Sequence, residues 1–374
     1  MALRQSFMDT NLFLELVRAG LWGTEVRLGS FENVNYPRLM ELANEQSLVG
    51  QIAAGMEHVV DTRIPKADIL LFIGQALQIE QRNKAMNAFI ASLIDRMQAA
   101  DIYTLLVKGQ GIAQCYEKPE WRACGDVDLF LSEDNYVKAK AFLLPMASSF
   151  EEEFVREKHL GMTIEGWVVE LHGHLYSGLS SRVEKELDRL QEDTFYGGQV
   201  RSWMNEKTQV FLLKAENDAF YVFTHILQHF YKGGIGLRQI CDWCRLLYTY
   251  RESINLDLLE QRIRRAGLMT EWKAFGALAI DYLGMPVESM PFYSASIKWK
   301  KKAKQILAFV MMSGNFGHNR GSSYMKNPYL VKKWYSMCRR IGDLFRHARI
   351  FPMDSLRFSF AILWNGVRSA MRGE

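Results

Sequence analysis

The stretch CGDVDLFLS, residues 124–132, places two aspartates one position apart in a segment that is otherwise largely apolar. Side chains alternate between the two faces of a strand. Asp126 and Asp128 therefore share one face with Phe130, and the opposite face carries Val127, Leu129 and Leu131. Two carboxylates on one face repel each other unless a proton or a cation compensates their charge. The stretch predicts a strand with one face in a core and a cation-binding site on the other.

A second strand supplies a third carboxylate. In WVVELHGH, residues 167–174, Glu170 lies on the face opposite Val169 and Leu171, while Glu165 comes just before Gly166 and is expected in a turn. If the two strands are neighbours, Glu170 meets the aspartate pair. Hard oxygen ligands of this kind suit Mg²⁺ or Mn²⁺, with substrate phosphates completing the coordination. Two such ions can activate an attacking hydroxyl and stabilise a leaving pyrophosphate.

Upstream, IYTLLVKG, residues 102–109, predicts a buried strand that ends in Lys108 and Gly109. A glycine there lets backbone amides approach phosphate oxygens, and the short helix predicted to follow adds its dipole. Lys108 can act as a point charge on the same phosphates.

The rest of the chain predicts helices around this small sheet. Residues 8–60 have helical spacing, and a long helix is expected to begin at Asp68 as its cap and to run to Ala99. Its apolar stripe, with Glu80 as an interruption, includes Ile69, Phe72, Ile73, Ala76, Leu77, Met86, Phe89, Ile90, Leu93 and Met97. From about residue 205 onward the spacing is helical again. The predicted class is α+β, with an N-terminal helical region (1–85), a small mixed-sheet core (86–204) and a larger C-terminal helical domain with a basic tail (205–374).

Composition indicates a folded protein of two or three domains, since 48% of the 374 residues are hydrophobic and 24% are charged. We find no apolar run long enough to span a bilayer and no signal-peptide core, so we expect a cytoplasmic protein without an integral membrane segment. Five cysteines fit a reducing compartment. Cys241 and Cys244 form a CxxC pair, which is either redox or metal chemistry or part of a helix core.

Charge is unevenly distributed along the chain. Residues 296–374 contain sixteen Lys or Arg and three Asp or Glu, a balance of +13, so the first 295 residues carry −9 of the net +4. A basic tail can attract nucleic acid, nucleotide or an anionic membrane surface. It can equally be a solvated face that keeps the protein soluble, and the sequence leaves both readings open.

These motifs together resemble the bacterial uncharacterised nucleotidyltransferase family of the DNA polymerase β-like nucleotidyltransferase superfamily. The resemblance covers about residues 68–245. It rests on a long helix followed by a series of motifs: LLVKG at 105–109, CYEKPEWRACGDVDLFL at 115–131, VELHGHL at 169–175, HILQH at 225–229 and GLRQICD at 236–242. The superfamily usually has Gly-Ser in the phosphate turn, where this chain has Gly109-Gln110 after Lys108.

The resemblance implies that Asp126, Asp128 and Glu170 hold Mg²⁺ or Mn²⁺ and that Glu170 helps to deprotonate the acceptor. Gly109, with Lys108 or Gln110, would lie along the triphosphate of an NTP. The implied reaction moves an NMP from the NTP to an unknown hydroxyl of a small molecule, a sugar, a protein or an RNA, and releases pyrophosphate. An inactive nucleotide-binding or scaffold protein with the same fold is the alternative.

Several polar residues have two readings at this stage. Arg122 contacts phosphate or pins its loop. Arg238 lies near the triphosphate, or pairs with Asp242 one helical turn away. His225 and His229 are one turn apart and pack toward the core or line the cleft, without the HExxH pattern of a metalloprotease. Glu170 with His172 and His174 would also suit the zinc of a hydrolase.

Overall fold

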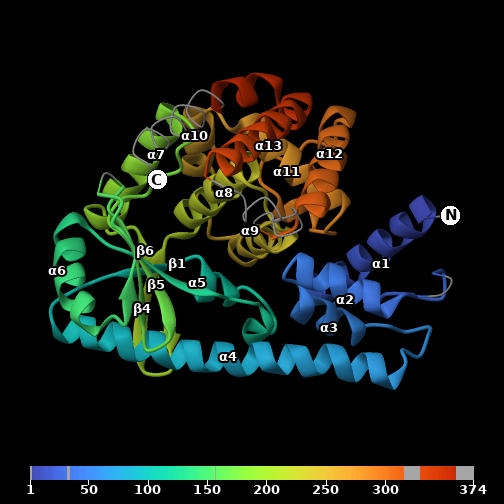
Figure 1. Ribbon diagram of the computed structural model, residues 1–374, viewed down its shortest axis with the longest axis horizontal. Helices are drawn as coiled ribbons and strands as arrows, with labels where there is room; N and C mark the ends of the chain where they lie inside the picture. Colours follow the sequence, from blue (N-terminus) through green and yellow to red (C-terminus); the bar gives the residue numbers. More distant parts are fainter. Residues whose placement is uncertain (1, 32–33, 156, 316–328, 359–374) are drawn as a thin grey trace.

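Seven strands form one mixed sheet in the computed structural model, which describes residues 2–31, 34–155, 157–315 and 329–358; the sheet lies at the left in Figure 1. The strand order is β3-β4-β5-β2-β1-β7-β6. The pairs β2–β5 and β1–β7 are parallel, and all other neighbours are antiparallel. The strands are β1 (Leu105–Val107), β2 (Asp126–Phe130), β3 (Ser149–Phe150), β4 (His159–Ile164), β5 (Trp167–His172), β6 (Val200–Asn205) and β7 (Thr208–Leu213). The predicted α+β class is confirmed, and the strand predicted in residues 167–174 is β5.

One face of the sheet packs on helices α4 (Lys66–Ala99) and α6 (Glu133–Leu143). The apolar face predicted for β2 lies in this core with Met86, Phe89 and Leu93 of α4. Val169 and Leu171 of β5 extend the same core. The alternation read from CGDVDLFLS is therefore confirmed, and it leaves both aspartates on the other face.

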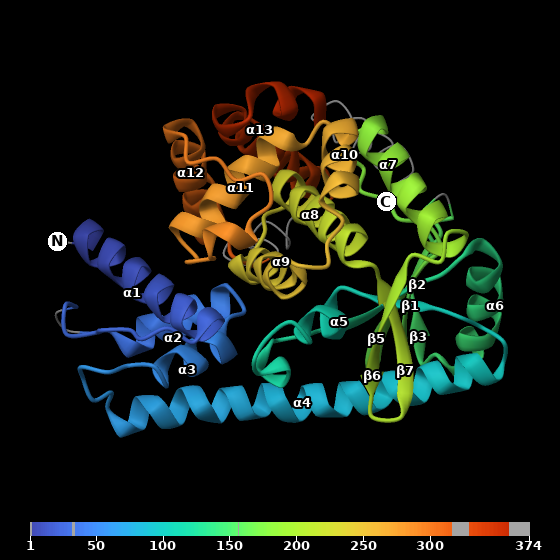
Figure 2. The ribbon, with the colours of Figure 1, turned by 180° about the vertical axis from the view of Figure 1, so that it is seen from behind.

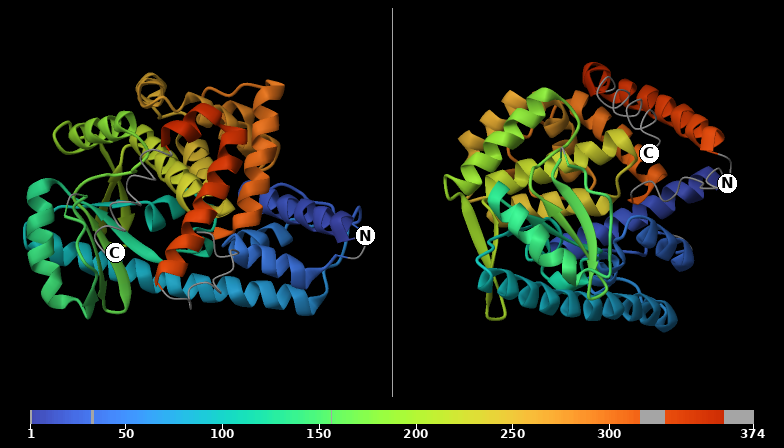
Figure 3. Two further views of the ribbon diagram at one scale, coloured as in Figure 1. Left: turned by 45° about the horizontal axis from the view of Figure 1, so that its top comes forward. Right: turned by 60° about the vertical axis from the view of Figure 1, so that its left-hand side comes forward.

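That second face is covered by the C-terminal helices, which form a larger core with Phe130, Leu105 and Leu213 of the sheet. In both views of Figure 3 this helical layer lies above the sheet and α4 lies below it. Its members are α7 (Ser181–Phe195), α8 (Ala215–Lys232), α9 (Leu237–Tyr250), α10 (Leu256–Ala266), α11 (Met269–Asp281), α12 (Ile297–Ser313) and α13 (Tyr329–Ile350).

The N-terminal helices α1 (Ala2–Trp22), α2 (Tyr36–Glu45) and α3 (Val49–Met56) rest on the first half of α4, whose second half supports the sheet (Figures 1 and 2). Helices α1 and α3 cross closely at two glycines. A Cβ on Gly20 would lie 1.9 Å from the Gln51 carbonyl oxygen, and one on Gly55 would lie 2.1 Å from the Leu16 carbonyl oxygen. Only glycine permits this approach, because a side chain would clash with backbone.

Helix α4 differs in detail from its prediction. It begins at Lys66 after Pro65, so Asp68 lies in the first turn, where its charge complements the helix dipole, and does not cap the helix. Ile69 and Leu77 of the predicted stripe are exposed, whereas Phe72 and Ala76 in the same stretch of α4 are buried. The interruption at Glu80 has a cause, since its carboxylate accepts a hydrogen bond from the Trp121 indole at 2.7 Å.

The helical reading of residues 205–214 is wrong. TQVFLL forms strand β7, which pairs with β6 in a hairpin and with β1 in parallel, and α8 begins only at Ala215. A short apolar run fits a helix or a strand equally well, and pairing with the distant strand β1 decided between them. The boundary proposed between 204 and 205 falls inside this hairpin, and α4 runs without a break across the boundary between 85 and 86. The division into three parts stays a prediction.

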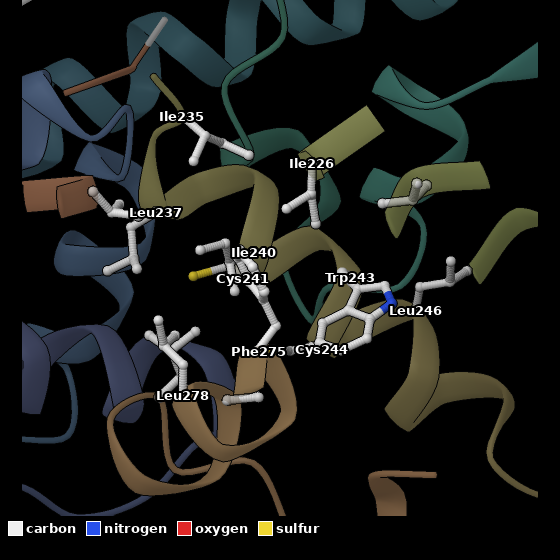
Figure 4. Close-up of a cluster of buried hydrophobic side chains, with 14 of the residues drawn as sticks. Ile226, Ile235, Leu237, Ile240, Cys241, Trp243, Cys244, Leu246, Phe275 and Leu278 are labelled. Atoms are coloured by element: carbon white, nitrogen blue, oxygen red, sulfur yellow. The ribbon is translucent and has the colours of Figure 1, made fainter. Parts of the chain in front are cut away.

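The CxxC pair lies in the core of the helical layer. Cys241 and Cys244 on α9 are fully buried among apolar side chains such as Ile240, Trp243 and Phe275 (Figure 4). Burial raises the pKa of both thiols well above its ordinary value. Inert buried thiols of this kind support the packing role over redox or metal chemistry. In the described part of the chain, no helix is long and apolar enough to cross a membrane.

Candidate active site

The three predicted carboxylates lie on two adjacent parallel strands. Asp128 of β2 stands directly opposite Glu170 of β5, and Asp126 is two residues before Asp128 on the same face. All three line a cavity of about 560 Å³ between the sheet and the C-terminal helices. The convergence of the carboxylates expected from strand alternation is therefore what the fold produces.

Lys108 and Gly109 form the turn that leads from β1 into α5 (Gly109–Ala113), and both line the same cavity. The Lys108 ammonium lies 2.7 Å from the Asp128 carboxylate. Its backbone has φ 57° and ψ −144°, a region that side-chain-bearing residues rarely occupy and that costs on the order of 1–3 kcal/mol. Gly109 follows at φ 37°. Helix α5 has five residues, so its dipole adds little to the site.

Burial and charge set the protonation of this cluster. Burial, followed by the Asp128 charge, raises the pKa of Asp126. Burial also opposes ionisation of Asp128, but the Lys108 charge and a hydrogen bond from His172 outweigh it and lower the pKa of Asp128. Burial disfavours the Lys108 ammonium in the same way, yet the Asp128 carboxylate keeps the pKa of Lys108 raised. The site therefore holds one strong ion pair and a second carboxylate, Asp126, whose charge is poorly compensated.

The loop before β2 is fixed from α4. The amide of Asn83 donates to the backbone carbonyls of Glu120 and Arg122 at 2.7 and 2.8 Å. The Gln110 amide in turn donates to Asn83 at 2.8 Å. The Gln110 side chain therefore points into the α4 packing and is absent from the cavity lining, unlike its predicted place along the triphosphate.

Helix α9 holds the same loop through Asp242, which pairs with Arg122 of the loop, and through Arg238. Arg122 donates two hydrogen bonds to Asp242, from Nε at 3.0 Å and from Nη2 at 2.6 Å, and both side chains are buried. Asp242 thus pairs with Arg122 across the fold, and Arg238 donates to the Ala123 carbonyl. This supports the loop role of Arg122, although both arginines also line the cavity. Among the residues that the structure describes, Arg122 Nη1 and Arg238 Nε are buried without a hydrogen-bond partner.

Two histidines reach the carboxylates from the β4–β5 side, and sequence reasoning had missed one of them. His172 Nε2 lies 2.8 Å from Asp128 Oδ1 and 3.5 Å from Glu170 Oε2, and His159 Nε2 lies 3.2 Å from the same Glu170 oxygen. Hydrogen bonds from these two histidines hold the pKa of Glu170 far below its ordinary range. His174 instead contacts Asp188 at 2.8 Å, so His174 was wrongly included in the predicted zinc ligand set of Glu170, His172 and His174. Only the register His159↔His172 of β4 and β5 brings His159 here.

The opposite wall of the cavity comes from α8 and α9. His225 and His229 line it, with 3.1 Å between their Nε2 atoms. Burial and the nearby Lys108 charge lower the pKa of His225 well below its ordinary value and that of His229 to about 4. Both imidazoles are therefore neutral near pH 7. The reading that they line the cleft is confirmed.

The comparison with protein families agrees with this geometry. Residues 32–284 match the family model described as "Uncharacterised nucleotidyltransferase". The chain belongs to this nucleotidyltransferase family. No curated protein and no solved structure gives a significant match. The family match spans the whole sheet and every cavity-lining residue except Asn315, whereas α12 and α13 lie outside it.

A divalent cation, which the nucleotidyltransferase resemblance implies, fits the residues present. Asp126 is largely buried, and no charged side chain of the described residues forms an ion pair with it. A cation beside Asp126 and Asp128 would relieve the repulsion that raises the pKa of Asp126. Glu170 stays ionised and suits a ligand, but its low pKa makes it a weak proton acceptor. The lowered pKa of Glu170 does not favour the role in deprotonation that the resemblance implies, and that role stays a prediction.

Proposed function

We propose that the protein transfers a nucleoside monophosphate from an NTP to a hydroxyl acceptor and releases pyrophosphate, with Mg²⁺ or Mn²⁺ held by Asp126, Asp128 and Glu170. The observation that carries this proposal is the direct pairing of Asp128 with Glu170 on parallel strands, facing a cavity that Lys108 and Gly109 also line. Membership of a nucleotidyltransferase family supports a nucleotide substrate.

In the proposed reaction the acceptor oxygen bonds to the α-phosphorus, the α–β phosphoanhydride bond breaks, and pyrophosphate leaves. The divalent cation, when bound, neutralises phosphate charge and lowers the pKa of the acceptor hydroxyl. Because Glu170 is a weak base, the hydroxyl proton passes to water. The cavity offers three cationic groups to the triphosphate, Lys108, Arg122 and Arg238, and two of these have buried N–H groups without a partner.

Lys108 has a specific part in this scheme. Its ammonium contacts Asp128 at 2.7 Å, which helps to keep the carboxylate ionised. Phosphate oxygens compete with Asp128 for the same ammonium, so a bound NTP is expected to draw Lys108 toward the phosphates and free Asp128 for the cation.

A second candidate function is nucleotide binding without turnover. The Lys108–Asp128 pair favours it, because the ammonium occupies one of the oxygens that a cation would use. Gln110 in place of the usual serine after Gly109, with its side chain turned to Asn83, favours it as well. Both candidates require NTP in the cavity, and they differ only in whether label reaches an acceptor.

The acceptor is proposed more broadly. The basic tail suits an anionic acceptor such as RNA, and α12 contributes Lys298, Lys300, Lys301 and Lys304 to it. Four further basic residues of the tail, Arg320, Lys326, Arg368 and Arg372, lie outside the described residues. A small molecule, a sugar or a protein hydroxyl would reach the cavity without the tail.

The test is incubation of the purified protein with each α-³²P-labelled NTP, Mg²⁺ or Mn²⁺, and a lysate of the source cell. Asp128→Asn is run in parallel, since the amide keeps the size of the side chain and removes its charge. Asp188→Asn serves as the matched control, because the half-exposed Asp188 pairs with His174 and does not line the cavity. Transfer by the wild type and by the control, with a loss of at least 100-fold in Asp128→Asn, supports the enzyme.

Two other results distinguish the candidates. Mg²⁺-dependent NTP binding by the wild type without transfer to any acceptor supports the non-catalytic function. Equal transfer by the wild type and Asp128→Asn refutes the role of the carboxylates.

A further inference from the structure

Imidazole and carboxylate ligands gather beside the proposed Mg²⁺ site in a way that nucleotidyl transfer does not require. The ligand atoms of His159, Glu170 and His172 all lie within 4.8 Å of one another. In the described ranges of the chain, no other group of three or more histidine, cysteine, aspartate or glutamate residues comes together in this way. The side chains are partly exposed, so an ion can reach them from solvent.

Two strands hold the three ligands rigidly. His159 and His172 are direct partners across β4 and β5, and Glu170 is two residues before His172 on the same face. Gly161 stands opposite Glu170 and brings no side chain, and the Glu151 carboxylate lies over it. Ligands on strands of one sheet are held more accurately than ligands on loops.

The distances match those of coordinated ligands. Glu170 Oε2 lies 3.2 Å from His159 Nε2 and 3.5 Å from His172 Nε2. For an ion with bonds of about 2.0–2.1 Å, neighbouring ligand atoms are separated by about 2.9 Å in octahedral and about 3.4 Å in tetrahedral coordination. The two distances from Glu170 fit these values, and the two Nε2 atoms lie within 4.8 Å of each other, so one ion can contact all three residues once the imidazoles move closer together.

We propose that His159, Glu170 and His172 bind a divalent transition-metal ion of the Zn²⁺ class, at a site that lies beside Asp126 and Asp128 and shares Glu170 with the proposed Mg²⁺ or Mn²⁺ site. Two imidazoles and one carboxylate suit Zn²⁺, Fe²⁺ or Co²⁺, whereas Mg²⁺ prefers oxygen ligands. Three protein ligands leave at least one coordination position for water or a substrate oxygen, as in catalytic zinc sites. The proposal stands independently of nucleotidyl transfer.

Hydrogen bonding is the competing explanation of the same contacts. In that case His159 donates from Nε2 to Glu170, His172 donates from Nε2 to Asp128 at 2.8 Å, and no metal is needed. In a metal site both Nε2 atoms carry lone pairs directed at the ion. His159→Gln separates the two, because the glutamine amide can still donate to Glu170 but is a poor ligand for Zn²⁺.

The experiment titrates untagged, EDTA-treated full-length protein with Co²⁺, without nucleotide, and follows the visible absorption of the protein-bound ion. Zn²⁺ is then added to displace it, and a second sample contains millimolar Mg²⁺. His159→Gln and His172→Gln are compared with His174→Gln, a matched control whose imidazole contacts Asp188 outside the group. Circular dichroism confirms that each variant is folded.

We expect the wild type and His174→Gln to bind one equivalent of Co²⁺, which Zn²⁺ displaces and Mg²⁺ does not. His159→Gln and His172→Gln should each weaken binding by at least 100-fold. Absence of stoichiometric binding by the wild type at 100 µM Co²⁺, or unchanged binding by His159→Gln, overturns the proposal. Since no NTP is present, inactivity in the transfer assay leaves this result unaffected.

Discussion

Replacing Arg122 by methionine tests whether its ion pair with Asp242 fixes the loop before β2. Methionine keeps much of the length and apolar stem of arginine and removes the charge. The Asp242 carboxylate then stays buried with one remaining hydrogen bond, from the Tyr116 hydroxyl at 2.8 Å, and with the Arg238 charge nearby. Breaking a buried ion pair on one side costs about 3–5 kcal/mol. Because Tyr116 and Arg238 remain, we expect the free energy of unfolding to fall by about 3 kcal/mol, near the lower end of this range.

The effect should depend on pH. In the wild type the folded pKa of Asp242 is lowered, so its contribution to stability is present above the unfolded pKa and is lost as pH falls. Without Arg122, burial raises the folded pKa of Asp242 instead. Stability of Arg122→Met then falls as pH rises through and above the unfolded pKa, about 3.9. The difference from the wild type should therefore be larger at pH 8 than at pH 5.

Urea unfolding, followed by far-UV circular dichroism and tryptophan fluorescence, measures the loss. Arg264→Met is the matched control, because Arg264 forms an exposed pair with Glu260 on α10 and should cost less than about 0.5 kcal/mol. The double variant Arg122→Met/Asp242→Leu should lose clearly less than the sum of the single variants, since no buried charge is then left unpaired. A loss below about 1 kcal/mol in Arg122→Met would refute the structural role and favour a phosphate contact as the main task of Arg122.

Two further predictions concern stability. Burial raises the pKa of Glu271 to about 8, so its contribution to stability is fully present below the unfolded pKa and is lost as pH rises toward 8. The free energy of unfolding of the wild type, measured by thermal unfolding, should fall by a few kcal/mol over this pH window. An equally steep fall in Glu271→Gln would contradict the assignment. Gly55→Ala should lower the melting temperature strongly, because its Cβ would lie 2.1 Å from the Leu16 carbonyl oxygen. The control is Gly74→Ala on α4, whose Cβ meets nothing within 4 Å and which should stabilise the protein by up to about 1 kcal/mol. Similar effects of the two alanines in a thermal melt would show that the α1–α3 crossing is looser than described.

Local patterns were sufficient where one strand or helix carried its own signal. The alternation in residues 126–131 predicted which side chains enter the core and which face the cavity, and the structure confirms it. The helical prediction for residues 208–213 was wrong because a short apolar run fits a helix or a strand equally well. Only pairing with β1 and β6 made this segment a strand. The place predicted for Gln110 along the triphosphate was missed for a similar reason, since its hydrogen-bond partner Asn83 is 27 residues away on α4.

The sequence by itself determined that two carboxylates share a face after a Lys-Gly turn, because alternation and turn chemistry are properties of neighbouring residues. Tertiary structure alone decided what surrounds them. The parallel pairing of β2 with β5 places Asp128 opposite Glu170, and the register of β4 brings His159 to the same glutamate. The packing of α9 pairs Asp242 with Arg122 instead of with Arg238. Each of these contacts joins residues that are far apart in the chain. They follow from how strands and helices pack together, and no local pattern encodes them.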